Sequence, residues 1–180
     1  TSLPSPMKIQ QTFEQARRDG YVGAVVVTIS SGLSATYETM NLVARQMEDF
    51  PVVTVDTKSI GVAAGMVVME AVRQVEAGTP LERLGSVLAA ASERVRVYFS
   101  VQKLDFLRKG GRISETIYRV GSLLNIKPVL TCDECEGKYV IEKKPRGWQK
   151  ALKTQVDLIA AQAERWNHVR VAVCTFDPAA

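Results

Sequence analysis

The sequence predicts an α/β protein of two domains: a parallel-sheet domain with helices on both faces, residues 1–95, and a second α+β domain, residues 96–180. Up to residue 95, runs of β-branched residues alternate with segments of helical periodicity, and this order is typical of a parallel sheet. After Arg96 the alternation stops, and an acidic turn separates two strand-like runs, which indicates a hairpin. A length of 180 residues accommodates two small domains.

The first domain is expected to open with a helix, because Ile9, Phe13 and Ala16 recur at helical spacing and Gly20 is a typical stop. The strand-like runs that follow are nearly all apolar, which predicts strands buried on both faces of the sheet. The expected strands are 22–29 and 51–55, and the further helices are 36–47, 59–75 and 80–95.

The second domain is expected to be less regular. A short helix passes through Leu104 and Leu107 and stops at two glycines, and the turn 133–137 joins the two strands of the hairpin. The other expected elements are strands at 97–101, 126–131, 139–141 and 169–175 and helices at 113–124 and 150–166.

The composition excludes several classes of protein. The chain is 46% hydrophobic and 23% charged, which is ordinary for a globular protein with a sizeable core. Its longest apolar run, 62–69, is far shorter than the ~20 residues of a membrane span. We expect no signal peptide, because no charged segment followed by an apolar one opens the sequence. Three cysteines, an odd number, argue against a disulfide framework, so we expect a cytoplasmic protein. Because the chain starts at Thr1 rather than Met, we expect a segment of a longer protein, cut at both ends.

A hydroxyl-rich loop follows the first predicted strand and precedes a helix; residues 30–36, Ser-Ser-Gly-Leu-Ser-Ala-Thr, are called the serine loop below. Ligands bind at the carboxyl ends of strands in open α/β sheets, and the N–H groups of a first helical turn favour a negative group. The loop therefore predicts a carboxylate or phosphate site. The alternative is that Ser31 or Ser34 only caps the helix. The loop has neither nucleophile-elbow nor Walker spacing.

Two further segments contain candidate ligand contacts. Residues 1–6, Thr-Ser-Leu-Pro-Ser-Pro, form a second hydroxyl cluster that its prolines keep extended. Within it, Ser5 is the expected N-cap of the first helix, with Pro6 at the first helical position. Asp56 follows the second strand, where an aspartate either contacts a ligand or starts a turn.

The second domain contains a basic segment with two glycines, 108–112, which is its most specific candidate binding site. Arg112 is suited to grip a phosphate or a carboxylate with two hydrogen bonds. The alternative is a solvated helix end, whose cations complement the helix dipole. Residues 96–153 carry 13 Lys or Arg against 6 Asp or Glu, a balance of +7, whereas the whole chain carries only +4. The basic excess therefore lies where a phosphorylated ligand or an acidic partner would bind.

The cysteines and the single histidine predict neither a metal site nor a catalytic couple. Cys132 and Cys135 form a Cys-x-x-Cys pair, but a zinc site needs two more ligands, and only Cys174 and His168 remain, far along the chain. A hairpin also lacks the helix N-terminus that lowers the pKa of a redox thiol. With one histidine, no nucleophile–histidine arrangement is indicated.

Six segments, taken together, resemble the DegV family in order and approximate spacing over nearly the whole chain. The serine loop with its neighbours resembles the motif Ser-Ser-Gly-Leu-Ser-Gly-Thr-Tyr of that family. One such motif is weak evidence, but six in register are strong. The segments are 1–6, 29–37, 55–59, 107–113, 121–128 and 142–146.

The resemblance implies a bacterial, cytoplasmic fatty-acid-binding protein of phospholipid metabolism with the EDD fold, whose acyl chain lies in an apolar tunnel. It implies that Thr1 and Ser34 contact the carboxylate, with Ser31 and Gly32 supporting the loop. A separate fatty acid kinase subunit would phosphorylate the carboxylate to an acyl phosphate, and Arg112, more weakly Arg146, resembles the cation associated with the phosphorylated ligand and kinase docking. The protein itself would be no enzyme, and would need no metal or cofactor beyond the bound long-chain fatty acid.

The acyl tunnel would be lined by the small and flexible residues after the second strand, among them Ile60 and Ala64. Burial of an acyl chain contributes roughly 0.8 kcal/mol per methylene group. For each of these residues singly, ordinary helix packing is an equally good interpretation. Contact with a membrane would be at most transient, for lipid exchange, and no nucleic acid is expected as a partner.

The chain departs from the family pattern at three positions, none of which removes a hydroxyl from the expected site. Leu3 stands in place of the usual Gln, Ala35 in place of Gly, and Thr28 in place of a frequent His. Family members also have a strand with an Asp-Ser-Thr loop before Thr1 and a His-Gly-Gly-rich segment after Ala180. The first domain is therefore expected to be incomplete at its N-terminus and the second at its C-terminus.

Two other functions remain as alternatives. The first is a phosphotransferase or hydrolase that acts on a small phosphorylated metabolite at the serine loop, which would need a base and a metal. The second is a regulatory DNA-binding module, although no helix-turn-helix or basic helix supports it.

Overall fold

The computed structural model describes residues 3–123 and 125–175. Its contacts divide the chain into two compact units, with a division between Val95 and Arg96. The turn Glu134–Gly137 belongs to the first unit, although the strands on either side of it belong to the second. The predicted domains, 1–95 and 96–180, stay a prediction, and the structure adds that this turn packs with the first unit.

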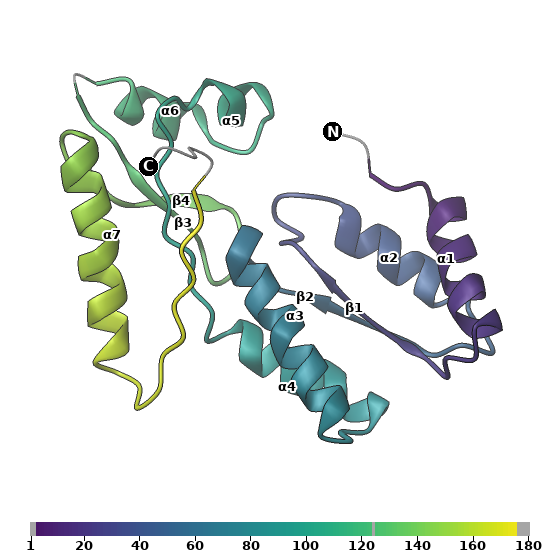
Figure 1. The fold of residues 1–180 in the computed structure, drawn as a ribbon. Coiled ribbons are helices and arrows are strands. Elements are labelled where there is room, and N and C mark those ends of the chain that lie inside the picture. Colours follow the sequence, from purple (N-terminus) through teal and green to yellow (C-terminus); the bar gives the residue numbers. More distant parts are fainter. Residues whose placement is uncertain (1–2, 124, 176–180) are drawn as a thin grey trace. The chain divides into compact units, whose positions relative to one another are not determined.

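The first unit is the expected parallel-sheet arrangement with helices on both faces (Figure 1). Strands β1 and β2 pair in parallel, with Thr28 opposite Asp56 at their carboxyl ends. The elements, in chain order, are α1 (Pro6–Arg18), β1 (Ala24–Thr28), α2 (Thr36–Ala44), β2 (Val52–Asp56), α3 (Gly61–Glu76) and α4 (Leu81–Ser92).

The two faces of this sheet are covered by two separate hydrophobic clusters. Alternate strand residues face opposite sides, so that Val26 joins one cluster and Val27 the other. One cluster is built on α1 and α2, around Ile9, Phe13, Val43 and Phe50. The other is built on α3 and α4, around Val67, Ala71, Leu84 and Leu88.

Most residues of β1 and β2 are half-buried, whereas the sequence predicted strands buried throughout. The difference follows from the size of the sheet. Among the described residues only these two strands pair in the first unit, so neither is a central strand with neighbours on both edges. The helices at both faces still confirm the predicted α/β class.

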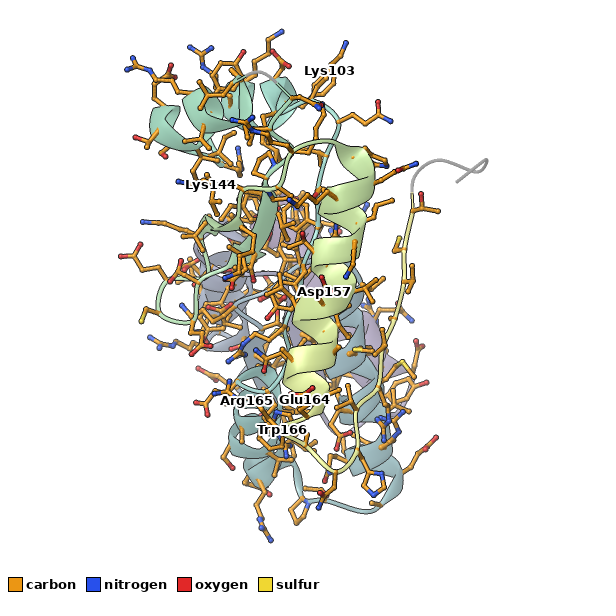
Figure 2. All side chains as sticks on the ribbon, turned by 90° about the vertical axis from the view of Figure 1, so that its left-hand side faces the viewer. Lys103, Lys144, Asp157, Glu164, Arg165 and Trp166 are labelled. Atoms are coloured by element: carbon orange, nitrogen blue, oxygen red, sulfur yellow. The ribbon has the colours of Figure 1, made fainter. Side chains whose placement is uncertain are left out.

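The second unit is α+β, as expected, and is built on an antiparallel hairpin. Its core joins Leu104, Ile113 and Leu130, with Phe99 and Tyr139 packed against them in an edge-to-face pair. Glu164, Arg165 and Trp166 follow the last helix (Figure 2). The elements are α5 (Asp105–Lys109), α6 (Glu115–Gly121), β3 (Val129–Cys132), β4 (Tyr139–Lys143) and α7 (Trp148–Ala163).

Two predicted strands of the second unit are wrong. In 97–101 only Phe99 pairs, through a single bridge in which Phe99 and Leu130 exchange N–H···O bonds of 3.0 and 2.8 Å. Residues 169–175 form no strand and are exposed, with Val173 91% exposed. Both segments have the composition of a strand, but a strand also needs a neighbour along its length. The described residues offer 169–175 no such neighbour.

Candidate functional site

The carboxyl ends of β1 and β2 lie at the same edge of the sheet, and two polar loops leave from this edge. The serine loop follows β1, and residues 57–60 connect β2 to α3. One backbone hydrogen bond joins the two loops: the N–H of Ser30 donates to the carbonyl of Ser59 at 2.8 Å. A second, from the N–H of Thr57 to the carbonyl of Thr28 at 3.3 Å, ties the second loop to the end of β1. The parallel pairing therefore brings together two segments that are about 25 residues apart, as the strand-end argument predicts.

Asp56 ties the two loops together rather than facing outward as a lone carboxylate. One of its oxygens accepts the N–H groups of Ser31, at 3.1 Å, and of Lys58, at 3.0 Å. Its other oxygen pairs with the Lys58 ammonium at 3.2 Å. Burial raises the pKa of the Asp56 carboxyl, but the hydrogen bonds from Ser31 and Lys58 outweigh burial, so the pKa lies below its ordinary value. Asp56 is thus an ionised carboxylate that links the two loops by hydrogen bonds.

Lys58 places a positive charge beside the serine loop, which the sequence analysis missed. Its ammonium donates to the hydroxyl of Ser31 at 3.2 Å as well as pairing with Asp56. Lys58 has a positive φ of 49°, an unusual conformation for a residue other than glycine. The segment 55–59 carries part of the family resemblance, but sequence alone does not show that this lysine folds back onto Ser31.

The hydroxyls of the serine loop fall into two kinds. The Ser30 side chain is fully buried; its hydroxyl donates to the carbonyl of Gly137 at 2.8 Å and accepts the N–H of Gly32 at 3.1 Å. The hydroxyls of Ser34 and Thr36 lie 2.8 Å apart, and both residues are half-buried. Either of these two hydroxyls can be the donor, so one hydroxyl proton of the pair is left to donate elsewhere. The pair can therefore donate to an anion, whereas the Ser30 hydroxyl uses its hydrogen bonds within the protein.

The start of α2 bears on the alternative that the serine loop only caps a helix. The N-cap residue is Ala35, which has no side-chain cap. The Ser34 hydroxyl accepts the N–H of Thr36, the first residue of α2, at 3.3 Å, so Ser34 does support the helix start. The N–H of Ser31 is used by Asp56 instead. A supporting role of Ser34 is compatible with ligand contact, because the Ser34–Thr36 pair keeps a proton to donate.

Of the other expected ligand contacts, Ile60 and Ala64 lie where α3 begins. Ile60 is the N-cap residue, half-buried, and Ala64 is 8% exposed. Thr1 lies outside the described residues. A cavity of about 180 Å³ is lined by residues of the second unit, among them Lys103, Tyr118 and Lys127, and not by Ile60 or Ala64. The lining of an acyl tunnel by Ile60 and Ala64 stays a prediction.

The two candidate arginines are exposed residues of the second unit. The Arg112 guanidinium donates to the carbonyl of Gly110, just past the end of α5, in agreement with the helix-end alternative. Arg108, by contrast, pairs with Glu115 at 3.1 Å and lies 4.2 Å from the ring centroid of Tyr118. All three arginines are exposed, but Arg108 is in addition stacked on Tyr118 and paired with Glu115.

The three cysteines lie in different surroundings. Cys132 is buried, and burial together with Asp133 raises the pKa of its thiol to about 12. Cys135 and Cys174 are exposed. The described residues contain no group of three or more metal-ligating side chains. At neutral pH the Cys132 thiol is protonated, and it is not activated as a nucleophile.

The arrangement defines a class of protein: an α/β protein with a hydroxyl-rich loop at the edge of a parallel sheet. Within the described ranges, no helix is long and apolar enough to cross a membrane. The chain belongs to the DegV family, whose sequence model, described as "Uncharacterised protein, DegV family", matches residues 1–178. This confirms the resemblance to that family.

The relatives include DegV domain-containing proteins of Clostridium acetobutylicum and Clostridium perfringens. Each is 33% identical to this chain over 159 residues, or 88% of this chain and 56% of the relative. The chain therefore spans a little over half the length of the curated relatives that it matches.

Solved structures of the family match the fold. A structure described as fatty acid binding of a DegV family protein from Thermus thermophilus has a TM-score of 0.79 at 33% identity, over 91% of this chain and 57% of that chain. A fatty acid binding DegV family protein from Streptococcus agalactiae has a TM-score of 0.81 at 27% identity, over 90% and 57%. DegV from Bacillus subtilis, described as a fatty acid binding protein, has a TM-score of 0.79 at 26% identity, over 91% of this chain and 57% of that chain.

Proposed function

We propose that this protein binds a long-chain fatty acid, with the carboxylate on Thr1 and Ser34 and the acyl chain along Ile60 and Ala64. The observation that carries the proposal is the Ser34–Thr36 hydroxyl pair, which keeps a proton for an anion at the start of α2. The Lys58 ammonium lies 3.2 Å from the Ser31 hydroxyl and provides a cation beside the loop, while it also pairs with Asp56. Solved relatives described as fatty acid binding support the same ligand class.

The same residues favour a binding site over a catalytic one. A hydrolase or phosphotransferase at the serine loop needs a general base. Asp56, the carboxylate that bonds to both loops, accepts two N–H groups and pairs with Lys58, and its lowered pKa makes it a poor base. The single histidine, His168, is exposed in the second unit. We therefore propose a carrier rather than an enzyme.

The proposal extends to a partner, a separate fatty acid kinase that phosphorylates the bound carboxylate to an acyl phosphate. The basic excess of residues 96–153 supports an acidic or phosphorylated partner. Arg112 and Arg146 are both exposed within that stretch, and such a cation can grip a phosphate. In this role the two arginines contact the phosphorylated head group or the kinase, and the cytoplasm is where the carrier and the kinase would meet.

Lipid extraction and mass spectrometry of the purified full-length protein test the ligand. We expect a long-chain fatty acid in the wild type and about tenfold weaker retention in Ser34→Ala, since roughly 1.4 kcal/mol of head-group bonding corresponds to a factor of ten. Ser86→Ala is the matched control, because the exposed Ser86 hydroxyl only donates to the carbonyl of Arg83 on α4. A protein purified from lipid-replete cells without any fatty acid would overturn the proposal.

The kinase role has its own test. Arg112→Ala is expected to keep the fatty acid and to slow its phosphorylation by the kinase, with exposed Arg165→Ala as the control. Loss of the lipid in Arg112→Ala would show that Arg112 holds the ligand instead.

A further inference from the structure

The acidic turn 134–137 packs directly on the serine loop within the first unit. The Ser30 hydroxyl donates to the carbonyl of Gly137 at 2.8 Å, across 107 residues of sequence. The same hydroxyl accepts the N–H of Gly32 at 3.1 Å. Both Ser30 and Gly137 are buried. One side chain therefore joins the turn of the serine loop to a turn from far along the chain.

Two glycines make this contact possible, because each lies where a Cβ atom has no room. A Cβ on Gly32 would come closer than 3.0 Å to the carbonyl oxygen of Glu136. A Cβ on Gly137 would come closer than 3.0 Å to the Ser30 hydroxyl and to 3.1 Å from the Cα of Lys58. Real Cβ atoms essentially never approach a neighbour below 3.0 Å. The two turns thus fit together only as long as both positions remain glycine.

A path of hydrogen bonds leads from the acidic turn to the proposed head-group contact. Gly137 fixes the Ser30 side chain, and the carbonyl of Ser30 accepts the N–H groups of Leu33 and Ser34, each at 3.1 Å. Ser34 in turn pairs with Thr36 at 2.8 Å. A displacement of Ser30 therefore moves the backbone that carries Ser34.

We propose that the turn 134–137 is a positioning element of the ligand site, which holds the serine loop in the shape that presents Ser34 to the carboxylate. The inference rests on the proposed fatty-acid binding. Gly137 and Ser30 do not contact the ligand in this scheme; they act through Ser34. Ligand affinity therefore depends on residues that are about 100 positions away from the loop in sequence.

Gly137→Ala in the full-length protein tests the proposal, with the dissociation constant for palmitate and the melting temperature without ligand as readouts. We expect at least tenfold weaker binding. The second substitution Ser30→Gly removes the atom that the new methyl group would approach below 3.0 Å and leaves the tight contact with the Cα of Lys58. We therefore expect the double variant to lose less affinity than the sum of the losses in Gly137→Ala and Ser30→Gly. Gly20→Ala is the control for backbone strain, because Gly20 has a φ of 90° and no atom within 4 Å of its Cβ position.

A merely structural role of the turn gives a different pattern. It would lower the melting temperature of Gly137→Ala, as in Gly20→Ala, and leave palmitate affinity unchanged in the folded protein, which overturns the proposal. If Gly137→Ala does not fold, Ser30→Ala decides, because it removes the hydrogen bond to Gly137 without adding an atom. Its control is Ser92→Ala, a buried serine whose hydroxyl donates to the carbonyl of Leu88 within α4.

In Ser30→Ala we expect several-fold weaker palmitate binding, and in Ser92→Ala we expect unchanged palmitate binding. Equal affinity in both variants and the wild type would again overturn the positioning role. A wild type that fails to bind palmitate at all refutes the proposed function instead, so the two failures are distinguishable.

Discussion

The serine loop of the first unit and the basic segment 108–112 of the second are both polar segments next to glycines, yet they are built differently. In the serine loop, polar groups satisfy one another: Ser30, Ser31 and Asp56 are all hydrogen-bonded to the neighbouring turns. In the basic segment, Arg112 is exposed, and its described hydrogen bond goes to the nearby Gly110 carbonyl. We therefore expect substitutions in the first segment to affect stability and binding together, and substitution of the exposed Arg112 to affect stability less.

The largest effect is expected from Gly32→Ala, because the new Cβ collides with a backbone carbonyl that cannot rotate away. We expect a loss of about 3 kcal/mol in the free energy of unfolding and loss of fatty acid. Urea unfolding measures the first and lipid extraction the second. Gly65→Ala is the control: no atom lies within 4 Å of its Cβ position on α3, so alanine is expected to gain up to about 1 kcal/mol. A Gly32→Ala variant with unchanged stability and unchanged fatty acid content would contradict the close packing of the serine loop on the turn 134–137.

Asp56→Asn ranks second, with an expected loss of about 2 kcal/mol at pH 7, since it weakens charge-assisted hydrogen bonds to Ser31 and Lys58. The pKa of Asp56 is lowered by folding, so its charge stabilises the protein fully above its ordinary pKa of about 4. This contribution is lost as the pH falls through the lower pKa of the folded state. Urea unfolding at pH 7, 5 and 3 checks this: the difference between wild type and variant should shrink only at the acid end. A difference that is constant with pH would contradict the charged state of Asp56.

Some parts of the fold could be predicted from the sequence and others could not, as individual residues show. Local periodicity predicted the helix of Ile9 and Phe13, and the parallel edge followed from the alternation of strands and helices. The bond from Ser30 to Gly137 could not be predicted, because it joins turns 107 residues apart and no local pattern encodes it. Strand composition misled at 97–101 and 169–175, because β-propensity describes the segment and not whether a neighbour pairs with it.

Ser59→Ala is expected to have a smaller effect of opposite sign. The Ser59 hydroxyl is buried and, within the described part of the chain, has no hydrogen-bond partner. An unpaired buried hydroxyl is unfavourable, so its removal should raise the free energy of unfolding by about 1 kcal/mol. Ser92→Ala, which breaks a buried hydrogen bond of 2.8 Å, should lower it by about 1 kcal/mol. If both variants lose stability equally, Ser59 has a partner in solution.

The smallest effect is expected from Arg112→Ala, which should change the free energy of unfolding by no more than about 0.5 kcal/mol, as is usual for an exposed side chain. Arg108→Ala is the sharp comparison within the same segment, because it loses both the stacking on Tyr118 and the pairing with Glu115. We expect it to lose about 1 kcal/mol. Urea unfolding of the two variants side by side measures the difference. If Arg112→Ala is the more destabilising of the two, Arg112 stabilises the fold. Its side chain is then used within the protein and is not available to bind a phosphate.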